Sequence, residues 1–391
     1  MFCYTSGTTG VPKAVKISHR NILSVSTAAN YAGVDVYDND TVISYLPLAH
    51  SFEKVLFVLC IFKAVRIGYY AGDVNKISED CMELKPTFFP SVPRLYNKIY
   101  DKINSKLKDL KPVSSFLAHR AISSKQYYLH TQGTLNYGMY DAIVCKKFRA
   151  VLGGRIRFMA TGSAPISPDV LNFLKVAFCC PIVEGYGQTE SCAVSFISLP
   201  TDPTCGHVGG PMPCVKMRLA DVPDMNYFVT DTPNPRGEIC LSGPSVTEGY
   251  YKDSQKTAQT IKNGWLHTGD VGVIMPNGAL KIVDRAKNIF KLAQGEYIAP
   301  EKLEGVFGQS PFIQEIFVHG DSLENYLVAI VVPDFEGVEA HYRRQGKCPQ
   351  PTVLCRNYKI RREQSKRDLR EQGSQRAHFA EHLGAGFGKQ V

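Results

Sequence analysis

Glycines and hydroxyl side chains gather near the start of the chain in the composition of a phosphate-binding loop. Residues 4–13 have the sequence YTSGTTGVPK. Glycines let a backbone approach phosphate oxygens closely, hydroxyls donate hydrogen bonds to them, and a lysine supplies positive charge. The run lacks the Gly-Lys-Ser/Thr ending of a Walker A loop, so it predicts a phosphate site of another kind. Its candidate contacts are Thr5, Ser6, Gly7, Thr8, Thr9, Gly10 and Lys13.

Further strings with chemical potential follow this loop in order. They are YLPLAHSFE at residues 45–53, TGSAP at 161–165, EGYGQTE at 184–190, GWLHTGD at 264–270, DR at 284–285 and NIFKLAQGEYIAPE at 288–301. Together with the loop they resemble the motif set of the adenylate-forming, AMP-binding superfamily, in the form typical of long-chain fatty acid–CoA ligases (long-chain acyl-CoA synthetases). The resemblance covers roughly residues 2–335.

This resemblance implies an ATP-dependent acid–thiol ligase. A long-chain fatty acid would first be activated as acyl-AMP, and the acyl group would then pass to coenzyme A. The chain is therefore expected to use ATP, Mg²⁺ and coenzyme A, and to adopt the adenylate-forming enzyme fold.

The resemblance also assigns roles in nucleotide binding, with the loop holding the β- and γ-phosphates of ATP. Tyr186 would offer a flat face to adenine, and Thr189 would contact the α-phosphate. The Glu190 carboxylate would hold Mg²⁺ against the triphosphate, as hard oxygen ligands do. Asp270 would accept both ribose hydroxyls, and Arg285 would reach the ribose or the α-phosphate. The other residues expected around the nucleotide are Gly162, Ser163, Ala164, Glu184, Gly185 and Gly187.

Three residues are assigned to the acyl and coenzyme A substrates. By resemblance, Lys291 belongs to the small-domain face used when coenzyme A attacks the adenylate, and Gly295 leaves a passage for the pantetheine arm. His50 would border the pocket for the carboxylate substrate. Taken alone, Lys291 is also compatible with an ordinary surface lysine, and His50 with a hydrogen-bonded core histidine. Lys291, Glu190 and Thr189 are the candidates for catalytic roles.

Departures from the family pattern give further expectations. The family has a large region before the phosphate loop, whereas residues 1–3 precede it here. The family also has a lysine near its C-terminus, in a Pro-Thr-x-Lys-like stretch, that bridges the α-phosphate and the carboxylate during adenylation; residues 351–354 are PTVL. Ala14 and Ala286 stand where a glycine and a basic residue are common. The chain is therefore expected to be partial and to form acyl-AMP slowly, because one well-placed cation is commonly worth a few kcal/mol.

Strand-like and helical runs alternate through residues 1–283, which predicts an α/β domain with a largely parallel sheet. From about residue 206 to 283 the pattern becomes strand-rich, as in a small barrel or antiparallel layer. A hinge is expected at Asp284, followed by a smaller, incomplete α+β domain over residues 284–335. Residues 336–391 are expected to form a divergent, basic and mostly disordered tail. The expected strands are 41–45, 66–70, 87–90, 156–161 and 181–184, and the expected helices are 20–31, 51–63, 93–109 and 168–177.

Composition excludes some classes of function. The net charge is +9, but residues 341–391 carry 12 basic and 4 acidic side chains, so the rest is almost neutral and no nucleic-acid partner is expected. Twelve cysteines without a Cys-x-x-Cys pair indicate reduced thiols in a cytosol-facing protein. The apolar run at residues 55–71 contains Lys63 and Arg66, which favours a buried helix and strand over a membrane span. Membrane association is expected of full-length relatives, at the endoplasmic reticulum, the mitochondrial outer membrane or the peroxisome.

Two other functions remain open at this point. One is a different adenylating enzyme, such as an aryl-CoA ligase, a carrier-protein adenylation domain or a luciferase; the strings at residues 45–53 and 290–301 argue against it. The other is a catalytically impaired remnant that binds nucleotide or acyl groups, which the missing lysine favours. The sequence fixes neither the chain length of the fatty acid nor the oligomeric state.

Overall fold

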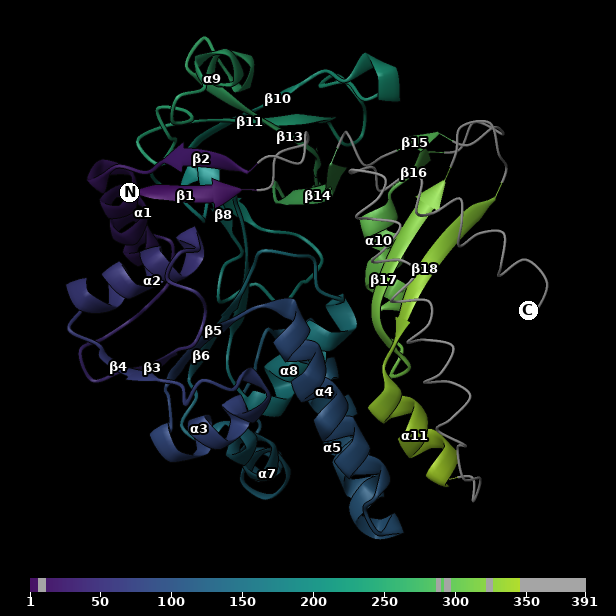
Figure 1. Ribbon diagram of the computed structural model, residues 1–391. Helices are drawn as coiled ribbons and strands as arrows, with labels where there is room; N and C mark the ends of the chain where they lie inside the picture. The colour runs from purple at the N-terminus through teal and green to yellow at the C-terminus, as the bar shows by residue number, and fades with distance from the viewer. Residues whose placement is uncertain (6–11, 286–289, 292–296, 321–325, 345–391) are drawn as a thin grey trace, which may run out of the picture. The chain divides into compact units, whose positions relative to one another are not determined.

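The computed structural model describes residues 1–5, 12–285, 290–291, 297–320 and 326–344 (Figure 1). The chain divides into two compact units, the first ending at Ala286 and the second beginning at Lys287. They are called unit 1 and unit 2 below, and each is described by itself.

Unit 1 contains a seven-stranded sheet in the order β4-β3-β5-β6-β7-β8-β9. The first five strands of this order are parallel, and β8 and β9 are antiparallel additions. Its strands are β3 (Thr41–Ser44), β4 (Arg66–Tyr69), β5 (Phe88–Ser91), β6 (Phe158–Thr161), β7 (Ile182–Tyr186), β8 (Phe196–Ile197) and β9 (Gly210–Pro211). The helix α1 (His19–Tyr31) precedes these strands. The helices between them are α2 (Ser51–Phe62), α3 (Ile77–Leu84), α4 (Pro93–Lys108), α5 (Pro112–Gln132), α6 (Gly138–Tyr140), α7 (Lys146–Arg149) and α8 (Pro168–Phe178), with short helical turns η1 (Val74–Lys76), η2 (Asp141–Cys145, a π-helix), η3 (Ala150–Leu152) and η4 (Thr189–Ser191).

Both faces of this sheet are buried, and alternate residues of each strand point to opposite faces. In β5, Phe89 packs in one apolar cluster with residues of α3, α4, α5 and α8. Its neighbour Phe88 packs in a second cluster with residues of α1 and α2. The same alternation separates Met159 from Phe158 in β6. This explains why the strands were recognisable as short, continuous apolar runs.

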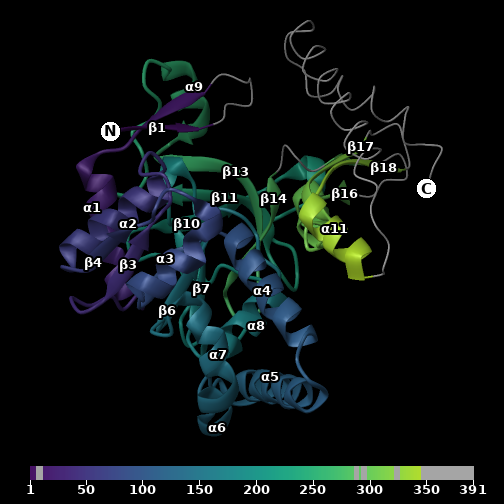
Figure 2. The same ribbon diagram turned by 60° about the horizontal axis from the view of Figure 1, so that its bottom comes forward.

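A second, antiparallel sheet closes one side of the α1–α2 cluster. Its order is β10-β11-β13-β12, and β14 also pairs with β13 (Figure 2). Ile239, Leu241 and Leu266 from this sheet share the cluster that contains Phe88. The Val208 amide donates to the Leu280 carbonyl at 2.8 Å, which joins the second sheet to the chain before β9. The elements are β1 (Phe2–Thr5), β2 (Lys13–Lys16), β10 (Lys216–Ala220), η5 (Pro223–Met225), β11 (Arg236–Ser242), α9 (Ser254–Thr260), β12 (Ile261–Lys262), β13 (Trp265–Ile274) and β14 (Leu280–Arg285), of which β1 and β2 form a separate hairpin.

Unit 2 is a small α+β unit. Its β17 and β18 are antiparallel, and Val318 in β17 donates its amide to the Glu304 carboxylate of α10 at 2.8 Å. The elements are β15 (Phe290–Lys291), β16 (Tyr297–Ile298), α10 (Pro300–Phe307), β17 (Ile313–Gly320), β18 (Leu327–Pro333) and α11 (Phe335–Arg344).

Two of the differences from the expectations concern the tail and the helix α5. The tail was expected to be disordered from residue 336, but residues 336–344 belong to α11; the remainder lies outside the described residues. The helix α5 was not expected, because its apolar residues do not gather on one face: Val113 and Phe116 are exposed whereas Ala121 and Ile122 are buried. The run at residues 55–71 is a helix leading into a strand, as predicted. No helix among the described residues is long and apolar enough to span a membrane.

Candidate functional site

A corner between the two sheets of unit 1 is built around the buried Asp270 carboxylate. The Tyr186 hydroxyl and the Gln188 side-chain amide each donate to Oδ2 of Asp270 at 2.6 Å. Arg285 Nε lies 3.4 Å from Oδ1. Burial raises the pKa of Asp270, and the hydrogen bond from Tyr186 and the charge of Arg285 oppose that rise. Side chains from three sequence motifs therefore meet on one carboxylate, and Tyr186 reaches it across 84 residues of sequence.

The tight turn after β7 depends on Gly187. A Cβ at this position would lie 2.2 Å from the Ala193 carbonyl oxygen, so only glycine fits without moving the backbone. The turn places Gln188 as the cap of η4, where its backbone amide donates to Oγ of Ser191 at 3.1 Å. Its side-chain amide also donates to the Thr268 carbonyl at 2.9 Å, which fixes the turn against the second sheet.

Glu190 and Lys13 both contact Tyr250, a residue that was not predicted from any motif. The Tyr250 hydroxyl donates to Oε1 of Glu190 at 2.8 Å, and Nζ of Lys13 lies 5.6 Å from the centre of the Tyr250 ring. Thr5 and Lys13 are register partners in the β1–β2 hairpin. The hairpin therefore holds both ends of the segment that contains Ser6, Gly7, Thr8, Thr9 and Gly10, and these five residues lie outside the described residues.

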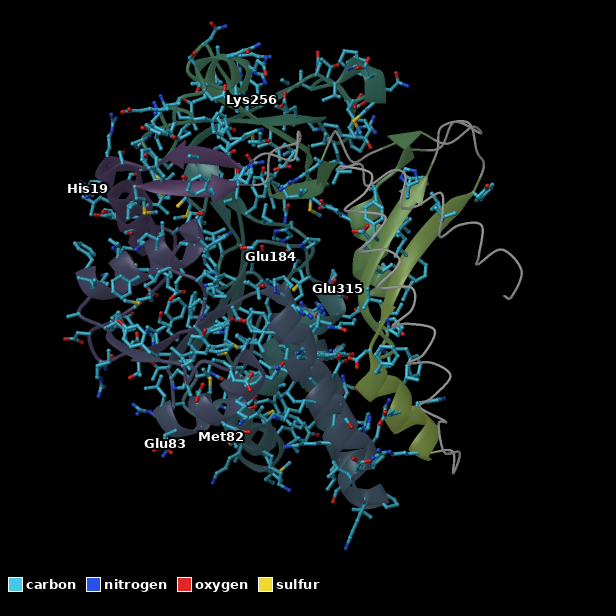
Figure 3. The ribbon with its side chains drawn as sticks, in the orientation of Figure 1. His19, Met82, Glu83, Glu184, Lys256 and Glu315 are labelled. Atoms are coloured by element: carbon cyan, nitrogen blue, oxygen red, sulfur yellow. The ribbon has the colours of Figure 1, made fainter. Side chains whose placement is uncertain are left out.

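Two polar atoms on neighbouring strands are buried and have no hydrogen-bond partner among the described residues. They are Oε2 of Glu184, labelled in Figure 3, and Oγ1 of Thr161. Thr161 and Glu184 are register partners in β6 and β7, so their side chains lie on the same face of the sheet. Burial raises the pKa of Glu184 to about 7, against the effect of Lys175. A buried polar atom without a partner is costly, which makes this pair a candidate ligand contact.

The predicted residues at the end of β6 follow directly on Thr161. A Cβ on Gly162 would lie 3.1 Å from the Gly185 carbonyl oxygen, so these two backbone segments approach each other closely. Ser163 has a φ of +73°, in the left-handed region that non-glycine residues rarely adopt. Ser163 and Ala164 are exposed. The chain thus turns sharply at the carboxyl end of the strand, where parallel sheets commonly bind ligands.

The turn at Asp270 is supported by Glu238, a residue that was not predicted from the sequence. Glu238 in β11 accepts the Gly269 amide at 3.0 Å through Oε1 and contacts Nδ1 of His267 at 2.8 Å through Oε2. Thr268 Oγ1 accepts the Asp270 amide at 3.1 Å. A Gly-Glu pair in a strand carries no motif, so only the register of β11 and β13 could reveal this support.

The motif at residues 45–53 lies partly in the core. Tyr45 is buried and shares a 2.7 Å hydrogen bond with Ser91. His50 caps α2, where its Nδ1 accepts the Phe52 amide at 3.2 Å. The structure thus shows His50 as the N-terminal cap of a helix. Its expected position beside the pocket for the carboxylate substrate stays a prediction.

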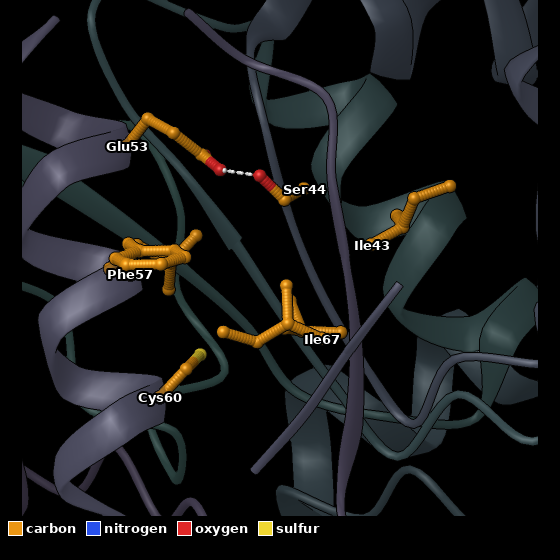
Figure 4. Close-up of a pocket in the computed structure, with 8 residues that line it drawn as sticks. Ile43, Ser44, Glu53, Phe57, Cys60 and Ile67 are labelled. Atoms are coloured by element: carbon orange, nitrogen blue, oxygen red, sulfur yellow. Dashed lines mark hydrogen bonds between the residues drawn. The ribbon is translucent and has the colours of Figure 1, made fainter. Parts of the chain in front are cut away.

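Glu53 from the same motif faces a small cavity (Figure 4). Ser44 donates to its Oε1 at 2.5 Å, and the other lining side chains are apolar or thiol. Burial raises the pKa of Glu53 to about 7, although the Ser44 hydrogen bond lowers it in part. The remaining lining residues are Val42, Ile43, Leu56, Phe57, Cys60 and Ile67.

The predicted residues of the second half-reaction belong to unit 2. Lys291 is in β15, opposite Tyr297 in β16. Gly295 lies outside the described residues. In unit 1, Thr189 is the first residue of η4, beside Glu190. The roles assigned to Lys291, Gly295 and Thr189 stay predictions.

Residues 1–251 match the family described as AMP-binding enzyme. The chain is 46% identical to "Long chain acyl-CoA synthetase 7, peroxisomal" of Arabidopsis thaliana over 92% of this chain and 51% of that protein. It is 44% identical to "Long-chain-fatty-acid--CoA ligase 1" of Homo sapiens over 93% of this chain and 52% of that protein. The chain therefore spans about half the length of the curated relatives it matches.

Solved structures agree with this fold. The A domain of a carboxylic acid reductase from Segniliparus rugosus, in complex with AMP and a co-purified carboxylic acid, matches with a TM-score of 0.67 and 30% identity, covering 87% of this chain and 50% of that chain. The adenylation domain of the carboxylate reductase from Mycobacterium chelonae matches with a TM-score of 0.71 and 27% identity, covering 96% of this chain and 53% of that chain.

Proposed function

The chain belongs to the AMP-binding enzyme family, and from that premise we propose that it is part of a long-chain fatty acid–CoA ligase. In that reaction ATP and a fatty acid form acyl-AMP and pyrophosphate, and coenzyme A then displaces AMP to give acyl-CoA. The proposal is supported by the identity to long-chain acyl-CoA synthetases along nearly the whole chain.

The observation that carries the proposal is the convergence on Asp270. Its carboxylate is pre-oriented by Tyr186, Gln188 and Arg285, and a carboxylate has acceptor sites beyond those three contacts. A ribose diol would find acceptors there that need no rearrangement. The adenine would then lie beside the Tyr186 ring, and the polar atoms of Glu184 and Thr161 would be available to the ligand.

Glu190 has the chemistry expected of a Mg²⁺ ligand. One of its oxygens accepts the Tyr250 hydroxyl, and the carboxylate supplies hard oxygen donors, which Mg²⁺ combines with substrate phosphates. Bound there, the ion would neutralise phosphate charge during displacement of pyrophosphate. Tyr250 would position Glu190, and Lys13 would add positive charge beside the triphosphate.

Calorimetry with ATP·Mg²⁺ tests the nucleotide site directly. We expect the full chain to bind ATP, and we expect Glu190→Gln to weaken binding more in the presence of Mg²⁺ than in EDTA. Equal weakening in both conditions would remove the metal role from Glu190, and no binding at all would contradict the proposed function.

The carboxylate substrate is proposed to be a long aliphatic acid. Each buried methylene contributes about 0.8 kcal/mol, so affinity should increase with chain length until the pocket ends. Competition between butyrate, palmitate and benzoate measures this. Equal affinity for butyrate and palmitate would contradict the proposal, and a preference for benzoate would favour an aryl-CoA ligase.

Lys291 is proposed to act in the transfer of the acyl group to coenzyme A. Thioester formation from synthetic palmitoyl-AMP and coenzyme A should therefore be lost in Lys291→Ala, whereas ATP binding should not change. We also expect the complete reaction from ATP, palmitate and coenzyme A to be slower than transfer from the preformed adenylate, since no adenylation lysine was identified. Equal rates would contradict that expectation.

Location is proposed only at the level of the family. Relatives include a peroxisomal synthetase. We propose that this protein acts at an organelle membrane that supplies its fatty acids, and fractionation of the protein in its own cells tests this.

A further inference from the structure

A cluster of four reactive or charged side chains lies away from the Asp270 corner. Lys125 comes from α5, Asp141 and Cys145 come from η2, and Cys179 caps the C-terminus of α8. Nζ of Lys125 donates to the Asp141 carboxylate, to Sγ of Cys179 at 3.2 Å and to the Leu135 carbonyl at 2.8 Å. None of these residues takes part in the proposed ligase chemistry.

The cluster has the spacing of a metal site, but a cation already occupies it. The ligand atoms of Asp141, Cys145 and Cys179 all lie within 4.8 Å of one another. The Lys125 ammonium is hydrogen-bonded to two of these three groups and is itself almost completely buried. A buried ammonium stays charged only when it is paired, and here it supplies the positive charge that a metal would otherwise bring.

The sulfur of Cys179 is therefore held in an activating environment. The contact with Cys145 lowers the pKa of Cys179, and Lys125 lowers it further. Burial and the charge of Asp141, whose Oδ1 accepts from the Cys179 thiol at 3.3 Å, act in the opposite direction. A thiolate is the reactive form of cysteine, and a neighbouring lysine favours it. Cys179 is also partly exposed, whereas Cys60 and Cys81 are fully buried and burial raises their pKa to about 12.

Cys145 is placed to react with an oxidised Cys179. Their sulfurs lie within 4.8 Å of each other. Cys145 is the last residue of η2, and Cys179 caps α8, which contacts η2. Cys180 is adjacent in sequence to Cys179, so their Cα atoms are about 3.8 Å apart, which is less than the roughly 4.4–6.8 Å that disulfides usually span. Of the described cysteines around Cys179, Cys145 is thus the better-placed partner.

We propose that Cys179 and Cys145 form an oxidisable thiol pair, with Cys179 as the site attacked by hydroperoxides. The Cys179 thiolate attacks the peroxide O–O bond, giving Cys179 sulfenic acid and, after protonation, water or an alcohol. The Cys145 thiol then attacks the sulfenic sulfur, and its proton leaves with the hydroxyl as water. The two thiols are oxidised by two electrons to one disulfide, and the peroxide is reduced.

The disulfide would link η2 to the residue that ends α8. Residues 180 and 181 lead from there directly into β7, which carries Glu184 and Tyr186. The pair is therefore three residues from the strand that supplies the proposed nucleotide site.

Mass spectrometry of the full chain tests the pair. After treatment with hydrogen peroxide and alkylation of the remaining thiols, we expect a tryptic peptide pair linked through Cys145 and Cys179. Cys145→Ser should abolish the link and trap the sulfenic acid, which dimedone then labels at Cys179. The matched variant Cys180→Ser should retain the link. A link between Cys179 and Cys180, or dimedone labelling of Cys179 no stronger than that of Cys60, would overturn the proposal.

A second measurement uses the unmodified sequence and does not depend on a variant folding. The rate at which iodoacetamide alkylates each cysteine is followed as a function of pH. At a pH below the pKa of a thiol, lowering that pKa by one unit raises the thiolate fraction about tenfold. We expect the alkylation of Cys179 to reach half its maximum at a lower pH than that of Cys214, whose pKa is raised by burial. The reverse order would contradict the activation of Cys179 by Lys125 and Cys145.

Discussion

The Asp270 corner and the Glu184–Thr161 pair both bury a carboxylate in unit 1, but they differ in how that carboxylate is satisfied. Asp270 has donors from Tyr186 and Gln188 and an ion pair with Arg285. Glu184 has an oxygen with no partner among the described residues. Burial raises the pKa of both groups, and for Glu184 the value is about 7.

This difference indicates two kinds of preparation for a ligand. Donors already fixed around Asp270 favour its ionised form, so it can accept hydroxyl groups without a change in protonation. Glu184 is poised between its two protonation states near neutral pH, so a ligand or the solution pH can decide its charge. Asp270 is thus a hydrogen-bond acceptor held in place by its donors, whereas the charge of Glu184 responds to pH or to a ligand.

The largest effect is expected from Asp270→Ala. The ribose would lose its acceptor, and affinity for ATP should fall by about 1–3 kcal/mol, which is about 5- to 150-fold in Kd. Calorimetry measures the affinity, and urea denaturation measures the accompanying loss of stability as Tyr186 and Gln188 lose their acceptor. Asp253→Ala is the matched control, because Asp253 caps α9 and its loss should reduce stability without affecting ATP. Unchanged affinity in Asp270→Ala would remove Asp270 from the site.

Tyr186→Phe tests how firmly the corner is held. The variant keeps the ring beside the proposed adenine position and deletes the hydroxyl that donates to Asp270. A hydrogen bond to a charged group contributes about 1.5–3 kcal/mol to the free energy of unfolding. Because Gln188 and Arg285 still contact Asp270, we expect a loss at the lower end of this range, about 1.5 kcal/mol. Tyr31→Phe, at an exposed tyrosine, should leave stability unchanged. Equal stability of Tyr186→Phe and the parent chain would show that the corner does not depend on this hydrogen bond.

The responsive character of Glu184 is tested through the pH dependence of stability. Its folded-state pKa of about 7 lies above its usual value, so the unfolded chain releases this proton first. Stability should therefore fall as pH rises from about 4.5 to 7 and then level off. Glu184→Gln should reduce that slope, and Glu53→Gln should reduce it further, since the pKa of Glu53 is also about 7. Thermal unfolding between pH 5 and 8 measures the slope, and an unchanged slope in both variants would contradict the raised pKa values.

The smallest effect is expected from Ser163→Gly. Ser163 has a φ of +73°, and glycine adopts this conformation without the steric cost of a Cβ. The variant should be more stable by less than about 1 kcal/mol, although the gain is reduced by the greater freedom of glycine in the unfolded chain. Ser167→Gly is the control, since Ser167 has a φ of −62° and should gain nothing. A destabilised Ser163→Gly would indicate that the serine side chain contributes more than its backbone costs.

The sequence determined the local elements and the chemistry-bearing strings. The apolar runs at residues 41–45 and 87–90 became β3 and β5, and the helix expected at residues 51–63 became α2 (Ser51–Phe62), because buried strands and amphipathic helices have strong local patterns. It also identified Tyr186, Glu190 and Asp270 through their motifs. The helix α5 was missed because its apolar residues do not gather on one face. The helix α11 is amphipathic, but it was missed because the apolar periodicity was judged to end at Pro333.

Only the tertiary structure decided which of these residues meet and which others join them. Tyr250 reaches Glu190 across 60 residues of sequence, and Glu238 supports the Gly269 amide across 31. Neither has a motif of its own. Glu238 is placed by the register of β11 and β13, and Tyr250 by its bridge to Val15 and by the apolar cluster that both residues share. The pairing of Lys125 in α5 with Cys179 at the end of α8 arises in the same way. Chemical identity is a property of each residue, whereas proximity is set by the fold as a whole.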